Sequence, residues 1–114
     1  MADHDIFVSA PRPDEVRAVI ETELAASFTA SQDPDPVPAL VTGATKVFFH
    51  DSHEFEDDRD FAVTQYRYWI SVHDSASNEQ RQLATAKRIF NALKARGWPV
   101  MLSFNLQGHI AVHP

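Results

Sequence analysis

The residues with the most obvious chemical potential lie between His50 and Asp60. Residues 51–60, called the acidic segment below, read Asp-Ser-His-Glu-Phe-Glu-Asp-Asp-Arg-Asp, so six of the ten side chains are carboxylates. His50, His53 and Glu54 are ligand types that divalent metals accept. Their spacing matches neither an EF-hand loop nor the His-Glu-x-x-His helix of zinc peptidases. We therefore expect no metal and no other cofactor.

The rest of the sequence contains no catalytic motif. The chain has no cysteine, which excludes thiol nucleophiles, thiolate metal sites and disulfides. Its three glycines are too scattered to build a phosphate-binding loop, and no serine lies in a Gly-x-Ser-x-Gly elbow. His50-Asp51 and His73-Asp74 are sequence neighbours, so their side chains would point to opposite faces of a strand. An enzyme is therefore the less favoured class, and no catalytic residue is assigned.

The acidic segment favours recognition of a partner by charge. A loop with many carboxylates and one aromatic residue can enter a basic cleft, where it imitates phosphates and speeds association. The hypothesis is a non-catalytic protein-binding module, for example an immunity or inhibitor protein. Its expected contact residues are His53, Glu54, Phe55, Glu56, Asp57, Asp58 and Asp60. The simpler alternative is a solubilising loop at the end of a sheet.

The formal net charge of −6 combines two parts of opposite sign. Residues 1–79 hold all sixteen acids and five bases, whereas residues 80–114 hold five bases and no acid, which gives −11 and +5. Most of the basic part falls in one predicted helix. It is either a solvated helix face or a surface for an acidic partner or a second copy. Net acidity without an RNA- or DNA-binding signature argues against nucleic acid as the partner.

Two amphipathic helices are predicted. Apolar residues recur at steps of three and four over residues 13–29, and Pro13 suits a first helical turn. The second helix is expected over 78–96, with Gly97 at its C-terminal cap. Prolines at three alternate positions make residues 30–39 an extended connection within the domain.

Strands are predicted from alternating apolar residues and turn signals. The clearest alternation runs from Phe61 to His73, and it places Tyr66 and Tyr68 on one side and Arg67 and Trp69 on the other. Further strands are expected near 5–9, in the second half of 40–50, from 100 to 106 and, after a turn at Gln107-Gly108, at 110–112.

The resulting order is β-α-β-β-α-β with a short final strand. It predicts one α+β domain over residues 1–114: a two-layer sandwich with an antiparallel sheet and two helices on one face, in the ferredoxin-like order. The other sheet face would be half exposed and would carry Arg67, Trp69 and Met101, as dimer or partner surfaces do.

That sheet face supports two alternative functions. One is a small dimeric α+β-barrel enzyme or ligand-binding protein, with a pocket lined by sheet aromatics near Tyr68, Trp69 and His73. The other is a structural subunit that assembles, for example as a homodimer, through the same face.

The expected location is the cytoplasm. The first residues include early acids and no apolar core, unlike a secretory signal. No apolar stretch approaches the roughly 20 residues of a membrane span, so no membrane association is expected.

Overall fold

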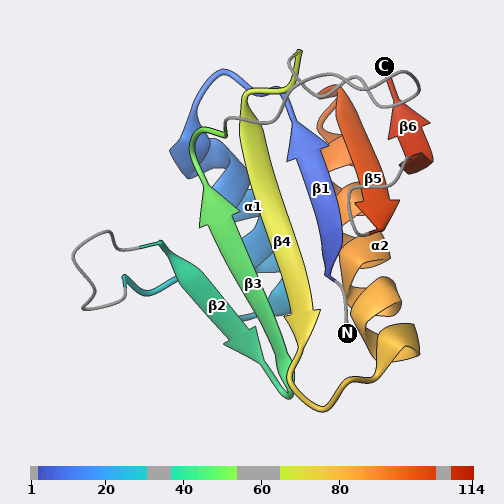
Figure 1. Ribbon diagram of the computed structural model, residues 1–114. Helices are drawn as coiled ribbons and strands as arrows, with labels where there is room; N and C mark the ends of the chain where they lie inside the picture. The colour runs from blue at the N-terminus through green and yellow to red at the C-terminus, as the bar shows by residue number, and fades with distance from the viewer. Residues whose placement is uncertain (1–2, 31–36, 54–64, 105–108) are drawn as a thin grey trace.

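The computed structural model describes residues 3–30, 37–53, 65–104 and 109–114. Within them, six strands form one antiparallel sheet, and two helices lie against one of its faces (Figure 1). The elements are β1 (His4–Val8), α1 (Pro13–Leu24), β2 (Ala39–Thr42), β3 (Thr45–His50), β4 (Tyr68–Asp74), α2 (Glu79–Ala95), β5 (Val100–Phe104) and β6 (His109–His113). The strand order is β2-β3-β4-β1-β5-β6, so the first strand lies inside the sheet.

The α+β class is confirmed, and the sheet has one strand more than expected. Ala39–Thr42 forms the separate edge strand β2, which pairs with β3 across a tight turn containing Gly43 at φ +60°. Of these four residues only Leu40 is buried, whereas Val41 is 57% exposed. A strand this short, with one buried residue, gives almost no alternation to detect.

Helix α1 ends five residues before the predicted end at 29. Ala25 adopts the left-handed conformation at φ 51°, which stops the helix. The backbone N–H of Phe28 then donates to Glu21 Oε2 at 2.8 Å, and the Phe28 ring meets Phe49 edge-on. The helical spacing of apolar residues predicted a longer helix because Phe28, which lies after the turn, also packs against the core.

Helix α2 matches its prediction closely. The Asn78 side chain accepts a hydrogen bond from the Arg81 backbone N–H at 3.0 Å and caps the first turn. At the other end, Gly97 adopts φ +79° and its N–H donates to the Lys94 carbonyl at 2.9 Å. No helix among the described residues is both long enough and apolar enough to cross a membrane.

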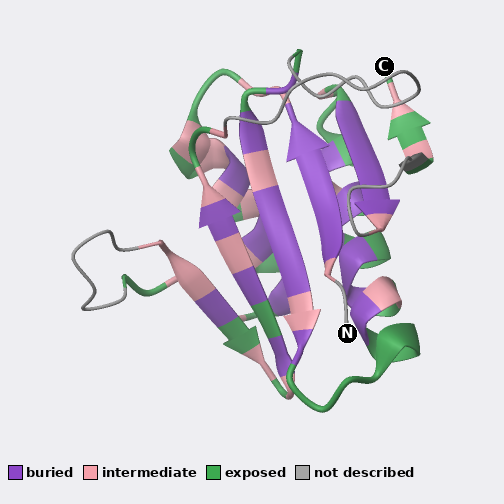
Figure 2. Ribbon diagram, viewed as in Figure 1, coloured by how far each residue is buried: buried purple, intermediate pink, exposed green. Residues whose placement is uncertain are grey.

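The main core lies between the two helices and the sheet (Figure 2). Its largest fully buried members include Tyr68, Phe49, Ile6, Ile20, Ile89 and Leu93. The prediction that Tyr66 shares a face with Tyr68 is wrong. Because β4 begins at Tyr68, the alternation does not extend back to Tyr66, which packs with Phe7 and Met101 on the opposite face. The predicted turn at Gln107-Gly108 lies outside the described residues.

Candidate functional site

Of the predicted loop contacts, His53 is within the described residues, and the others (Glu54, Phe55, Glu56, Asp57, Asp58 and Asp60) lie outside them. His53 Nε2 lies 2.6 Å from the carbonyl oxygen of Tyr66. Because a carbonyl can only accept, His53 donates from Nε2. The contact therefore joins the two chain segments that flank residues 54–64.

Both flanking segments are attached to the sheet. The His53 ring meets Phe7 of β1 edge-on at 5.3 Å between centroids, and the Ser9 hydroxyl donates to the Gln65 carbonyl at 2.9 Å. Tyr66 packs with Phe7 and Met101 in a second apolar cluster. The base of the acidic segment is thus fixed to β1 and β5.

The structure brings together two of the three predicted sheet-face residues. Trp69 is half-buried and packs against the cluster that contains Met101. Met101 is only 3% exposed, so this face is more buried than expected, because residues beyond the strand ends pack onto it. Arg67 lies apart from them: its guanidinium is 5.4 Å from the ring centroid of Tyr68, a residue of the helix-side core.

A buried acid, Asp5, occupies the middle of the same face. Strand register places it between Ser71 of β4 and Ser103 of β5, and it is 3% exposed. Trp69 Nε1–H donates to Asp5 Oδ1 at 2.9 Å, and the His50 ring stacks on the Trp69 ring at 3.9 Å. Burial raises the pKa of Asp5 to about 6, although the hydrogen bond from Trp69 opposes this rise.

With this pKa, the Asp5 carboxyl holds a proton below about pH 6. The neighbouring Ser103 hydroxyl is completely buried and has no hydrogen-bond partner among the described residues. Grooves lined by described residues lie between the helices, beside Phe49 and beside Tyr66, and none of these three includes Asp5. In this structure Asp5 is therefore a buried acid within the sheet face.

Substitution of Trp69 by phenylalanine should raise the pKa of Asp5 above its value of about 6. The variant removes the N–H that stabilises the ionised carboxyl while keeping an aromatic ring in place. An NMR pH titration of the Asp5 carboxyl carbon measures the change. Trp98→Phe, at a tryptophan packed against the helix-side core, is the control. An unchanged Asp5 pKa in Trp69→Phe would show that the hydrogen bond has no influence.

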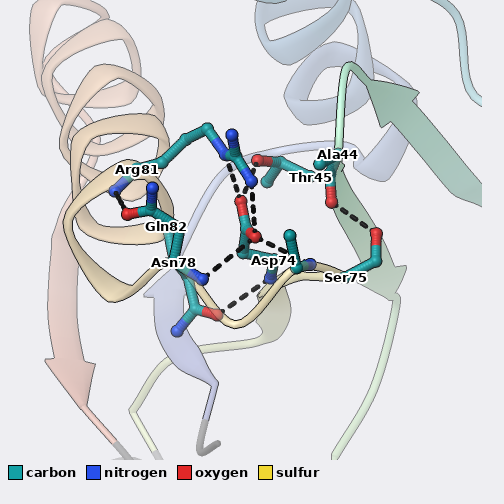
Figure 3. Close-up of polar contacts among 8 residues, drawn as sticks. Ala44, Thr45, Asp74, Ser75, Asn78, Arg81 and Gln82 are labelled. Carbon is teal, nitrogen blue, oxygen red and sulfur yellow. Dashed lines mark hydrogen bonds and ion pairs between the residues drawn. The ribbon is translucent and has the colours of Figure 1, made fainter.

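A second buried carboxylate, Asp74, joins β4 to α2 (Figure 3). It accepts hydrogen bonds from Arg81 Nε at 2.5 Å and Nη2 at 2.8 Å, and from the backbone N–H groups of Ala76 and Asn78. The Thr45 hydroxyl donates to it at 3.3 Å. The hydrogen bonds from Arg81, followed by those from the backbone, hold the pKa of Asp74 well below its usual range.

The network continues to β1 through Gln82. The Gln82 side-chain oxygen accepts from the Asp74 backbone N–H at 2.9 Å, and its amide nitrogen donates to His4 Nδ1 at 2.7 Å. Burial lowers the pKa of His4, which favours the neutral ring that this contact requires. These groups hold the start of α2 against the sheet, so we regard the network as structural.

Ion pairs in the fold partly neutralise the acidic residues of 1–79 with basic residues of 80–114. Arg81 pairs with Asp74, and Arg88 pairs with Glu23 Oε1 at 3.2 Å while also donating to the Glu23 carbonyl at 2.6 Å. Two of the five bases of the C-terminal part thus neutralise acids of the N-terminal part. The interpretation of α2 as a surface for an acidic partner is correspondingly weakened.

The histidines are placed in different environments. His50 stacks on Trp69, His53 contacts the Tyr66 carbonyl, and His73 Nδ1 lies 2.8 Å from Asp3 Oδ1 at the surface. Among the described residues, no group of three or more histidine, aspartate, glutamate or cysteine side chains could hold a metal ion.

Sequence reasoning did not single out Asp5, Ser71 or Ser103. The available signal was the position of Asp5, which directly precedes the apolar run Ile6-Phe7-Val8. A charged residue at the start of a buried strand is uncommon enough to mark for inspection. Nothing in the sequence around Ser71 and Ser103 marks them, because only the strand register places them beside Asp5.

No protein-family model matches the chain, and no curated protein or solved structure is significantly similar to it. The function is therefore inferred from the residues of this chain.

Proposed function

We propose that the protein is a non-catalytic binding module that docks its acidic segment into a basic site on a protein partner. The supporting observation is the concentration of formal charge on a segment whose base is anchored. Residues 51–60 hold six carboxylates and one arginine, a formal charge of −5 in a chain whose net charge is −6. The other 104 residues together are therefore almost neutral.

Ion pairs between described residues support this distribution. Among the described residues, three acids outside the segment pair with arginine, as Arg12–Asp14, Arg81–Asp74 and Arg88–Glu23. By formal charge the acidic segment holds most of the net charge, and a field of one sign accelerates encounters with a partner of the opposite sign. Attachment of the segment's base through His53 and Tyr66 reduces the freedom that binding must remove.

Neutralising the segment should remove partner binding. The variant carries Glu54→Gln, Glu56→Gln, Asp57→Asn and Asp58→Asn, which changes the charge of the segment from −5 to −1. Immobilised protein is exposed to a lysate of the native host, and the proteins retained by both forms are quantified. We expect the retained basic partner to fall by about tenfold or more.

The control has the same net charge but an intact segment. It carries Asp14→Asn, Asp33→Asn, Asp35→Asn and Glu79→Gln, and it should retain the partner as the unmodified protein does. Equal retention by all three proteins, or loss in the control alone, would refute docking through the acidic segment.

We also propose that a ferredoxin-like core underlies this fold. Leaving out the edge strands β2 and β6 gives the order β3-β4-β1-β5, with α1 following β1 and α2 following β4. In that interpretation the acidic segment is the connection between the second and third strands of the core. This connection joins two neighbouring antiparallel strands, β3 and β4.

A further inference from the structure

The outer surface of the helix layer contains a groove between α1 and α2. Its volume is about 450 Å³, and its floor is made by small or short side chains: Ala18, Val19, Thr22, Ala92 and Ala95. Ala18 and Ala95 are exposed. Alanines at such positions allow another helix to approach closely, to an axis separation near ~8 Å.

The two helices carry opposite charges. Helix α1 has four acids and one arginine, whereas α2 has one acid and four bases, which gives formal charges of −3 and +3. They run antiparallel, because Glu15 near the start of α1 shares the groove with Arg96 after the end of α2, and Glu23 pairs with Arg88 further along. At the groove itself, α1 contributes Glu15 and Glu23 and the α2 side contributes Arg96, while Arg88 beside it pairs with Glu23 of the same chain.

One wall of the groove contains a carboxylate oxygen that lacks a donor. Glu15 Oε2 is buried and has no hydrogen-bond partner within the described part of the chain. A buried acceptor left unsatisfied is costly, so rotation of the Glu15 side chain toward an N–H donor in the groove would be favourable. An occupant of the groove must also match the acids of α1 beside Arg96.

We propose that the occupant is a second copy of this chain, related by a two-fold axis that runs parallel to the helices. This axis places α1 of each copy over α2 of the other at the same level along the groove. Glu15 then lies opposite Arg96 of the partner subunit, and Glu23 lies opposite Arg88 of the partner subunit. A two-fold axis across the helices would instead place acid on acid, so the charge pattern selects one of the two arrangements.

The area of the proposed interface indicates how tightly the two copies should bind. Helices of 12 and 17 residues are roughly 18 and 26 Å long at about 1.5 Å per residue. Side by side they offer a footprint on the order of 400–500 Å² per chain, below the ~800 Å² typical of stable complexes. The dimer should therefore be weak and should form in the micromolar range or above.

Sedimentation equilibrium over about 10 μM to 1 mM, in ~0.15 M salt that screens distant charges but not contact pairs, tests the proposal. The expected result is a reversible monomer–dimer equilibrium. Ala95→Trp fills the groove and should abolish the dimer. Val41→Trp is the matched control, because Val41 is exposed on β2 and faces away from the helices, as its buried neighbour Leu40 shows. Circular dichroism confirms that both variants are folded.

Charge-reversal variants test the proposed pairing between the two copies more specifically. Glu15→Arg and Arg96→Glu should each raise the dimer Kd by about 10- to 100-fold, because each places like charges opposite one another. The double variant exchanges the two charges and should return the Kd close to its original value. A chain that stays monomeric at ~1 mM would overturn the proposal. So would a dimer weakened equally by Ala95→Trp and Val41→Trp, or a double variant no better than the singles.

Discussion

Arg81→Ala is expected to lower the melting temperature by roughly 5–10 °C at pH 7. Arg81 supplies two of the hydrogen bonds to Asp74, whose side chain is completely buried. Without the guanidinium, a buried carboxylate keeps its charge and loses its counter-ion, which costs far more than loss of an exposed pair. Thermal unfolding followed by circular dichroism measures the effect.

The control and the pH dependence identify the cause. Lys87→Ala removes a positive charge from an exposed position of α2 and should change the melting temperature by only a few degrees, roughly 2–4 °C. Because the pKa of Asp74 is lowered on folding, its contribution is present above the ordinary aspartate pKa and is lost as pH falls through the lowered value. The melting temperatures of Arg81→Ala and the unmodified protein should therefore begin to converge below about pH 4. Similar losses in both variants would contradict this role.

Asp5→Asn is expected to stabilise the protein at pH 7.5. The pKa of Asp5 is raised from 3.8 to about 6, and a pKa difference of this size corresponds to ~3 kcal/mol against the ionised native state. Asparagine keeps an oxygen that can accept from Trp69 but adds an NH₂ group that needs partners. We therefore expect a net gain of about 1–2 kcal/mol in the free energy of unfolding. Urea denaturation provides the measurement.

The pH dependence of this gain has a defined sign. Between about pH 4 and 6 the folded chain holds a proton on Asp5 that the unfolded chain has released, so the Asp5 contribution to stability falls as pH rises. His4 and His50 have pKa values lowered by burial and act in the opposite direction. The difference between Asp5→Asn and the unmodified protein isolates Asp5, and it should grow from pH 4.5 to 7.5. A constant difference for Asp5→Asn would disprove the buried-acid interpretation.

The parts of the fold that the sequence predicts well depend on local signals. Helix α2 has a capping residue, Asn78, a long apolar periodicity and Gly97 just beyond its end, and all three act within a few residues. The end of α1 and the strand β2 depend on distant contacts. Thr29 pairs with Ala39 across the intervening connection, and no local pattern indicates that bridge.

The candidate site shows the same limit. Asp5 and Trp69 are 64 residues apart and meet because β1 lies between β4 and β5. Sequence alone places Trp69 and Met101 on a sheet face but does not place Asp5 between two serines on that face. The acidic segment, in contrast, is visible directly from composition, and its attachment through His53 and Tyr66 is visible only in the structure.

The most direct test of the central claim is the affinity of the captured partner for the protein, measured at ~0.05 and ~0.3 M salt. Docking through the acidic segment predicts a Kd that rises steeply with salt, mainly through slower association, because screening weakens the attraction between the charged surfaces. The variant with Glu54, Glu56, Asp57 and Asp58 neutralised should bind about tenfold or more weakly at low salt, with little further salt dependence. A Kd that is unaffected by salt and equal in the neutralised variant would contradict the account.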